Sequence, residues 1–214
     1  MLKLFSILPL TVLISIGCKS SSNESELFTK LNLIYSDDFN GEFNPEFWQK
    51  RTKNWQIKDG ILFGVPDFKT KEEAMKALNR DHHLGLGPVI RLEQIPPKFV
   101  CELRFKYTGK EVTESRPKID FGHHVMNLFL KDKGYNLRLP KSETFENRKS
   151  GFELNKWNDL KVEFKPGKMI IVMNGNRQVF EHEKVTLNDR KEFTFKALDG
   201  GTLQIDSVKL WEGL

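Results

Sequence analysis

The chain has 214 residues, of which 38% are hydrophobic and 29% charged. This balance excludes a bundle of membrane-spanning helices and a disordered acidic tail, and the 17 Phe and 4 Trp can fill one sizeable core. The formal net charge of +5 comes from 34 basic and 29 acidic side chains that are interspersed, a pattern that does not indicate a nucleic-acid-binding protein. The two cysteines, Cys18 and Cys101, are too few for a disulfide scaffold or a Cys-rich metal site.

The amino terminus has the pattern of an export signal. A positive Lys3 precedes an apolar run over residues 4–16, which is shorter than the ~20 residues that span a bilayer as a helix. The run ends in Gly17-Cys18, which resembles the cleavage box of bacterial lipoproteins, although Ser15 stands where Leu is usual. We therefore expect a signal peptide over 1–17 and a lipid on Cys18, with plain secretion as the alternative.

The residues after the cysteine are polar and aperiodic, and we expect 18–29 to be a flexible tether. A lipid on Cys18 would be the chain's partner in a membrane and would place the protein in the bacterial cell envelope. Lys19 stands where some bacteria use Asp for inner-membrane retention, which favours the outer membrane.

Alternating apolar and polar residues predict β-strands in the rest of the chain. The odd positions of 99–107 are all apolar, and 160–165 and 193–196 alternate in the same way. Asp59-Gly60 and Asn174-Gly175 each separate two such runs and predict tight hairpins. Leu203 and Ile205 differ in phase from Val208 and Leu210, which predicts a bulge near Ser207.

One segment has a helical pattern. Residues 70–78 contain good helix formers, and Thr70 with Glu73 makes a capping box. Many short strands with one short helical insertion predict an all-β, antiparallel β-sandwich, as a single domain over 30–214. Cys101 falls at an apolar position of its strand and is expected to be a buried thiol.

The order of several short motifs resembles that of bacterial concanavalin A-like jelly rolls of the 3-keto-disaccharide hydrolase-like family. The motifs are Asp37-Asp38-Phe39, Phe47-Trp48, Trp55 to Leu62, Asp81-His82-His83 with Arg91, Trp157 to Val162, Val172 to Gly175 and Ile205 to Trp211. The resemblance covers residues 35–212 and implies a jelly-roll fold with a role in cleaving or binding carbohydrate. The Gly-Asn-Ser-Gly-type stretch common in members labelled hydrolases is absent, and 119–127 contains histidines instead.

Two histidine pairs, each near an aspartate, are the candidate chemical groups. They are His82-His83 after Asp81, and His123-His124 after Asp120. Adjacent residues of a strand point to opposite faces, so one member of each pair could line a shared surface. The residues could act as acid–base groups, contact sugar, hold a divalent metal, or simply bond to backbone at strand ends. No cofactor is otherwise expected, and the identity of any metal stays open.

Three further residues are candidates for carbohydrate contact. Arg91 and Arg138 are charged residues within apolar strands. The guanidinium could hydrogen-bond to sugar hydroxyls or to a carboxylate, or it could lie on a solvent-exposed face of the strand. The tryptophans are better explained by packing, and Trp48 is the exception that we expect to stack on sugar.

The laminarinase-type glycosidase run Glu-x-Asp-x-(x)-Glu, with its paired carboxylates, is absent from the chain. We find no nucleophile elbow, Walker loop or His-Glu-x-x-His helix. Two hypotheses follow: a hydrolase acting on glycosides or (3-keto) disaccharides, and a non-catalytic surface module that binds glycan or protein. A purely structural role in the envelope is a third.

Overall fold

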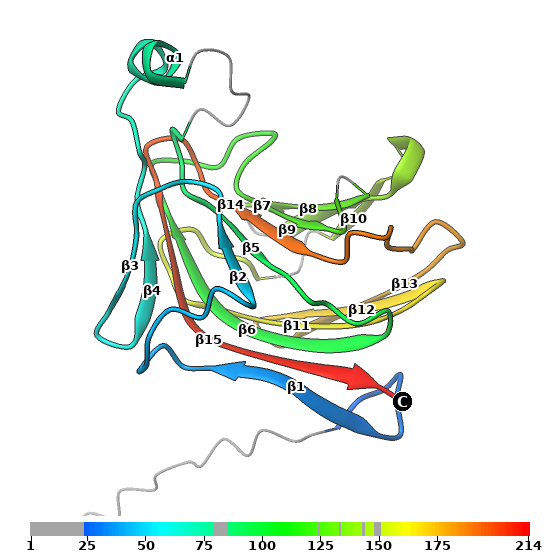
Figure 1. Ribbon diagram of the computed structural model, residues 1–214. Helices are drawn as coiled ribbons and strands as arrows, with labels where there is room; N and C mark the ends of the chain where they lie inside the picture. Colours follow the sequence, from blue (N-terminus) through cyan, green and yellow to red (C-terminus); the bar gives the residue numbers. More distant parts are fainter. Residues whose placement is uncertain (1–23, 79–84, 124, 133, 143, 148–150) are drawn as a thin grey trace, which may run out of the picture.

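The computed structural model describes residues 24–78, 85–123, 125–132, 134–142, 144–147 and 151–214. These residues form fifteen strands in two antiparallel sheets that pack face to face (Figure 1). The predicted all-β sandwich with one short helical insertion is confirmed.

The larger sheet has eight strands, in the order β13-β12-β11-β6-β15-β4-β3, with β1 also paired to β15. Its strands are β1 (Leu31–Asp37), β3 (Trp55–Lys58), β4 (Ile61–Gly64), β6 (Phe99–Thr108), β11 (Asn158–Lys165), β12 (Lys168–Met173), β13 (Asn176–Glu181) and β15 (Thr202–Gly213).

The smaller sheet has seven strands, in the order β10-β9-β8-β7-β14-β5-β2. Its strands are β2 (Trp48–Lys50), β5 (Val89–Leu92), β7 (Lys118–Phe121), β8 (Met126–Lys131), β9 (Gly134–Arg138), β10 (Thr144–Asn147) and β14 (Phe193–Lys196). A short 3₁₀ turn, η1 (Pro140–Ser142), precedes β10.

The core lies between the sheets and is rich in aromatic rings. Phe99 of the larger sheet stacks on Phe164 and meets Phe193 of the smaller sheet edge to face, with ring centroids 5.2 Å apart in both pairs. Cys101 is 3% exposed within this core, as predicted. The inward side chains of every strand are thus committed to packing, so any ligand must bind on an outward face, at a rim or in a loop.

The local signals in the sequence are confirmed. Asp59-Gly60 and Asn174-Gly175 turn the β3–β4 and β12–β13 hairpins with positive φ at all four residues, which these residue types tolerate best. The register of β15 shifts between Ile205 and Ser207, where the bulge was expected. Such a bulge lets both phases of the strand face the core.

The helical prediction is also confirmed, as α1 (Lys71–Leu78). The Thr70 hydroxyl accepts the Glu73 amide at 3.2 Å, and the Glu73 carboxylate accepts the Lys69 amide at 3.0 Å. Within the part of the chain that the structure describes, no helix is long and apolar enough to cross a membrane.

The segment before β1 is attached to the outer face of the larger sheet. The carboxylate of Glu163 on β11, 2% exposed, accepts the Ser25 hydroxyl at 2.6 Å and the amides of Glu26 and Leu27 at 2.9 and 3.0 Å. Phe28 packs with Val100 and Trp211 nearby. Residues 25–28, inside the expected tether, therefore contact the sandwich.

Candidate functional site

Polar side chains cross the outward face of the seven-stranded sheet, the face turned away from the eight-stranded sheet. Strand pairing places one residue from each strand side by side in a line that we call the polar row. Its members in spatial order are Gln49, Arg91, Thr194, Asp120, Asn127, Arg138 and Thr144. Their neighbours along the strands, such as Ile90, Phe193 and Leu128, point into the core. The alternation of strand side chains therefore builds this polar face.

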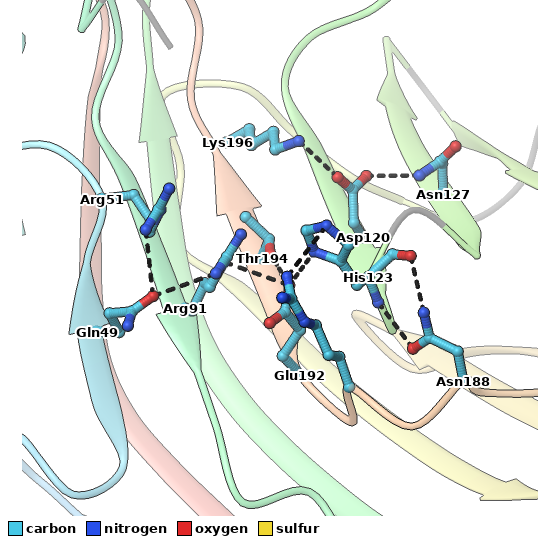
Figure 2. Close-up of polar contacts among 11 residues, drawn as sticks. Gln49, Arg51, Arg91, Asp120, His123, Asn127, Asn188, Glu192, Thr194 and Lys196 are labelled. Carbon is cyan, nitrogen blue, oxygen red and sulfur yellow. Dashed lines mark hydrogen bonds and ion pairs between the residues drawn. The ribbon is translucent and has the colours of Figure 1, made fainter. Parts of the chain in front are cut away.

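Asp120, at the centre of the row, is 2% exposed and fully paired. Its two carboxylate oxygens lie 2.9 Å from the Lys118 amine and 2.8 Å from the Lys196 amine. It also accepts the Asn127 amide at 2.7 Å, and Figure 2 shows the contacts with Lys196 and Asn127. Burial alone would raise the pKa of the carboxyl, but the two ammonium groups outweigh that effect and hold the pKa below its ordinary value. Asp120 is therefore a carboxylate at neutral pH and cannot serve as a proton donor there.

Glu192, which precedes β14, joins Arg91 to His123. One of its oxygens lies 3.3 Å from Arg91 Nε and 3.1 Å from His123 Nδ1 (Figure 2). The Arg91 contact is an ion pair without hydrogen-bond geometry, so Nε is a buried donor without an acceptor, while its Nη1 donates to Gln49 at 3.2 Å. Burial lowers the pKa of Arg91 and the charge of Glu192 opposes this change.

The position of His123 is fixed by its backbone as well as by Glu192. Gly122 ends β7 with φ of 67°, and Asn188 then accepts the His123 amide at 3.2 Å and donates to its carbonyl at 3.0 Å. A carboxylate can only accept, so His123 Nδ1 carries the proton, and Nε2 faces Arg190 Nη1 at 3.4 Å. The imidazole side chain is 29% exposed and can reach a ligand on this face.

The structure brings together four of the predicted residues on one face. Asp120, Arg91 and Arg138 belong to the polar row, and His123 lies beside it. His82, His83, His124 and Cys18 lie outside the described residues. Within the ranges that the structure describes, no group of three His, Cys, Asp or Glu residues is arranged to hold a metal ion.

The structure contradicts the expectation that Trp48 stacks on sugar. Trp48 is 1% exposed, donates its indole N–H to the Tyr35 hydroxyl at 3.0 Å, and packs against Phe39 and Phe195. A ring enclosed in this way leaves no face for a sugar. Its place on β2 explains the difference, because Trp48 takes the inward position of that strand while Gln49 takes the outward one.

Sequence reasoning missed Lys118, Lys196 and Glu192, which neutralise and orient the predicted residues. A signal for two of them was present, since Glu192 and Lys196 alternate with the core residues Phe193 and Phe195 and so had to share the outward face. Their pairing with Asp120 and His123 depends on β14 lying beside β7, a contact between segments some seventy positions apart.

Comparison with solved structures shows the same fold in glycan-degrading enzymes. The chain superposes on a prokaryotic beta-1,3-1,4-glucanase (lichenase) from a mouse hindgut metagenome with a TM-score of 0.56 and 13% identity, covering 84% of this chain and 99% of that one. A non-specific endo-beta-1,3(4)-glucanase from family GH16 superposes with a TM-score of 0.55 and 11% identity, covering 87% of this chain and 92% of that one. The laminarinase catalytic domain from Thermotoga maritima superposes with a TM-score of 0.56 and 12% identity, covering 86% of this chain and 99% of that one.

At these identities the likeness establishes the fold, and the predicted concanavalin A-like jelly roll is confirmed. Neither a protein-family model nor a curated protein matches the sequence. On β7 the outward residues Lys118 and Asp120 are followed by His123, with the spacing of the laminarinase-type Glu-x-Asp-x-x-Glu run. A single carboxylate thus stands between two basic side chains, where that run would have three acids.

Proposed function

We propose that the protein is carbohydrate-active and binds a glycan along the outward face of the seven-stranded sheet. The polar row carries this proposal, because it lines up donors and acceptors across the whole sheet in a fold shared with glucanases. Strands lie about 4.8 Å apart, so a row over seven strands extends roughly 29 Å, enough for several sugar units. Sugar hydroxyls both donate and accept, and therefore suit a surface of amides, guanidinium groups and hydroxyls.

The site suits glycan binding better than it suits hydrolysis of the kind that uses a pair of carboxylates. Such hydrolysis needs one protonated acid and one free carboxylate. Asp120 is ionised between two lysines, and Glu192 is held by Arg91 and His123. Both carboxylates are thus held in ion pairs with neighbouring side chains, and they fix the positions of the donors in the polar row.

A glycan panel tests the binding proposal. We expect at least one β-glucan or envelope polysaccharide to retard the protein in affinity electrophoresis, and Asn127→Ala to weaken that binding about fivefold through loss of one hydrogen bond in the row. Asn176→Ala, an exposed change on β13 of the other sheet, is the matched control and should bind normally. Failure of every glycan to bind, or equal weakening by both variants, would refute the proposal.

Hydrolysis of a glycosidic bond is the second candidate function, supported by the His123–Glu192 pair. Glu192 fixes the proton on Nδ1, which leaves Nε2 to take a proton from water once Arg190 moves aside. The water oxygen would then bond to the anomeric carbon as the glycosidic bond breaks, and the proton taken up by Nε2 would return, through solvent, to the leaving oxygen. The resemblance in sequence adds 3-keto disaccharides to the candidate substrates.

Incubation with 3-keto and ordinary disaccharides, with and without a chelator, tests this second function. We expect release of monosaccharide that His123→Ala reduces at least a hundredfold, in line with the usual contribution of general acid–base catalysis. Release that His123→Ala leaves unchanged would exclude this residue as the catalytic group. Loss of release on addition of the chelator would reveal a dependence on a divalent metal.

We further propose that Cys18 carries the lipid that anchors the protein to the cell envelope, in the outer membrane. The support is the signal-like pattern of residues 1–18. Metabolic labelling with a palmitate analogue should mark the intact chain and should fail with Cys18→Ala. Labelling of that variant, or secretion of an unlabelled wild-type chain, would contradict the anchor.

A further inference from the structure

A pocket at one end of the polar row is lined by two cationic side chains, Lys131 and Arg138, and one acidic side chain, Glu114. It has a volume of about 460 Å³ and opens between β8, β9, β10 and the loop before β7. Its lining is formed by Glu114, Ser115, Phe129, Lys131, Asn136, Arg138 and Thr144. In Figure 1 these strands lie at the opposite side of the molecule from β1.

The floor of the pocket is an aromatic ring with three cationic groups around it. Phe129 is 9% exposed, and its centroid lies 4.8 Å from the Arg138 guanidinium, 5.4 Å from the Lys118 amine and 5.9 Å from the Lys131 amine. Like charges gathered at one ring repel one another unless anions compensate them. Lys118 has that compensation, because it is paired with Asp120.

The other two cations have only neutral partners. Lys131 donates to the carbonyl oxygens of Thr113 and Glu114 at 3.2 and 2.7 Å, and Arg138 donates to the Asn127 amide oxygen at 3.4 Å. Neither forms an ion pair with a carboxylate among the residues that the structure describes. Arg138 is exposed and keeps most of its five N–H donors, and one N–H of Lys131 remains.

We infer that this pocket is a subsite for an acidic sugar, a uronic acid unit of the bound glycan. The planar fork of Arg138 matches a carboxylate, the Lys131 ammonium lies on the same side of the ring, and Phe129 offers an apolar floor to the C–H groups of the sugar. The carboxylate of the uronic acid would supply the anionic partner that Arg138 and Lys131 lack. This inference rests on the proposed binding face and adds the class of sugar to it.

Matched sugars test the subsite. Oligogalacturonate, oligomannuronate and glucuronate-bearing xylo-oligosaccharides would each be compared by calorimetry with their carboxyl-reduced, neutral counterparts. For at least one pair we expect the acidic form to bind about tenfold more tightly, the effect of one charge-assisted contact. The preference should shrink as salt rises, whereas the affinity for the neutral form should not.

Arg138→Gln keeps the length of the side chain and removes its charge. Because Arg138 also belongs to the polar row, both forms should bind more weakly, but the affinity for the acidic form should fall about tenfold further, so that the preference for the acidic form disappears. Lys58→Gln removes the same charge at an exposed position of β3 in the other sheet, and it should keep the full preference for the acidic form.

The results separate this inference from the proposed function. Equal binding of acidic and neutral forms in every pair, or a preference that survives Arg138→Gln, overturns the acidic subsite while the glycan-binding face stands. Binding of neither form, together with failure of the neutral glycan panel, overturns both.

Discussion

Asp120 shows how a single residue supports the candidate site. Its buried carboxylate forms ion pairs with both Lys118 and Lys196, which occupy the next outward position on their own strands. Removing one member of a buried charged group leaves the others uncompensated, a larger effect than the net value of the pairing itself. The centre of the polar row should therefore depend on this one carboxylate.

Asp120→Asn should lower the free energy of unfolding by about 3 kcal/mol, because two largely buried ammonium groups lose their anion. Urea denaturation at pH 7 measures the change. Asp159→Asn is the control, since Asp159 pairs with Arg104 on the exposed face of the other sheet and should cost at most about 1 kcal/mol. Equal effects of the two substitutions would contradict the central role of Asp120.

The stabilisation by Asp120 should also depend on pH. Its pKa in the folded protein lies below the ordinary value of 3.8, so the carboxylate stabilises the fold above that pH and loses this effect as pH falls through the folded pKa. The stability difference between wild type and Asp120→Asn should therefore be full at pH 7 and narrow below about pH 4. A difference that stays constant down to pH 2.5 would show that the ion pairs do not cause it.

The elements explain how much of the site the sequence could predict. Alternation identified β6, β11 and β14, and turn chemistry identified two hairpins, because these signals depend on residues close together in the chain. Arg91 and Arg138 could be selected because each is a charge within an apolar strand, and Asp120 because it lies beside a histidine pair. Their assembly could not be predicted, since the order β8-β7-β14-β5 joins segments far apart in sequence.

Trp48 illustrates the same limit. A strand of three residues gives too short a pattern to decide which side faces the core. Its pairing with Leu92 on β5 decides this, and turns the indole inward against Phe195. The face of a short strand is thus set by its neighbour in the sheet and not by its own sequence.

At the level of segments, Glu163 should determine the attachment of residues 25–28. It accepts two backbone amides and one hydroxyl from them, besides an ion pair with Lys161 at 3.1 Å. Glu163→Gln should retain the fold but weaken these bonds, so the amides of Glu26 and Leu27 should exchange hydrogen about tenfold faster.

Glu181→Gln is the matched control for that measurement. Glu181 lies exposed on β13 of the same sheet and pairs with Lys168, so its loss should leave both amides unchanged. Unchanged exchange in Glu163→Gln would show that other contacts, such as the pair between Arg177 and Glu26, hold the segment.

At the scale of the whole molecule, the two sheets differ in what their outward faces hold. The segment leading to β1 is attached to the outer face of the eight-stranded sheet, and the polar row occupies the outer face of the seven-stranded sheet. Figure 1 shows how the two sheets face each other. Residues 25–28, the described residues that follow the proposed lipid site at Cys18, lie on the side opposite the polar row. The proposed glycan face would then point away from the membrane and stay accessible to polymer.

Backbone NMR of the ¹⁵N-labelled protein, titrated with the tightest-binding glycan, tests this central claim most directly. We predict that the amides of β14, β7, β8 and β9 shift, with the largest changes around Asn127 and Arg138, while those of β1, β11 and β13 stay in place. Shifts confined to the eight-stranded sheet, or spread evenly over both sheets, would contradict the assignment of the glycan to the polar row.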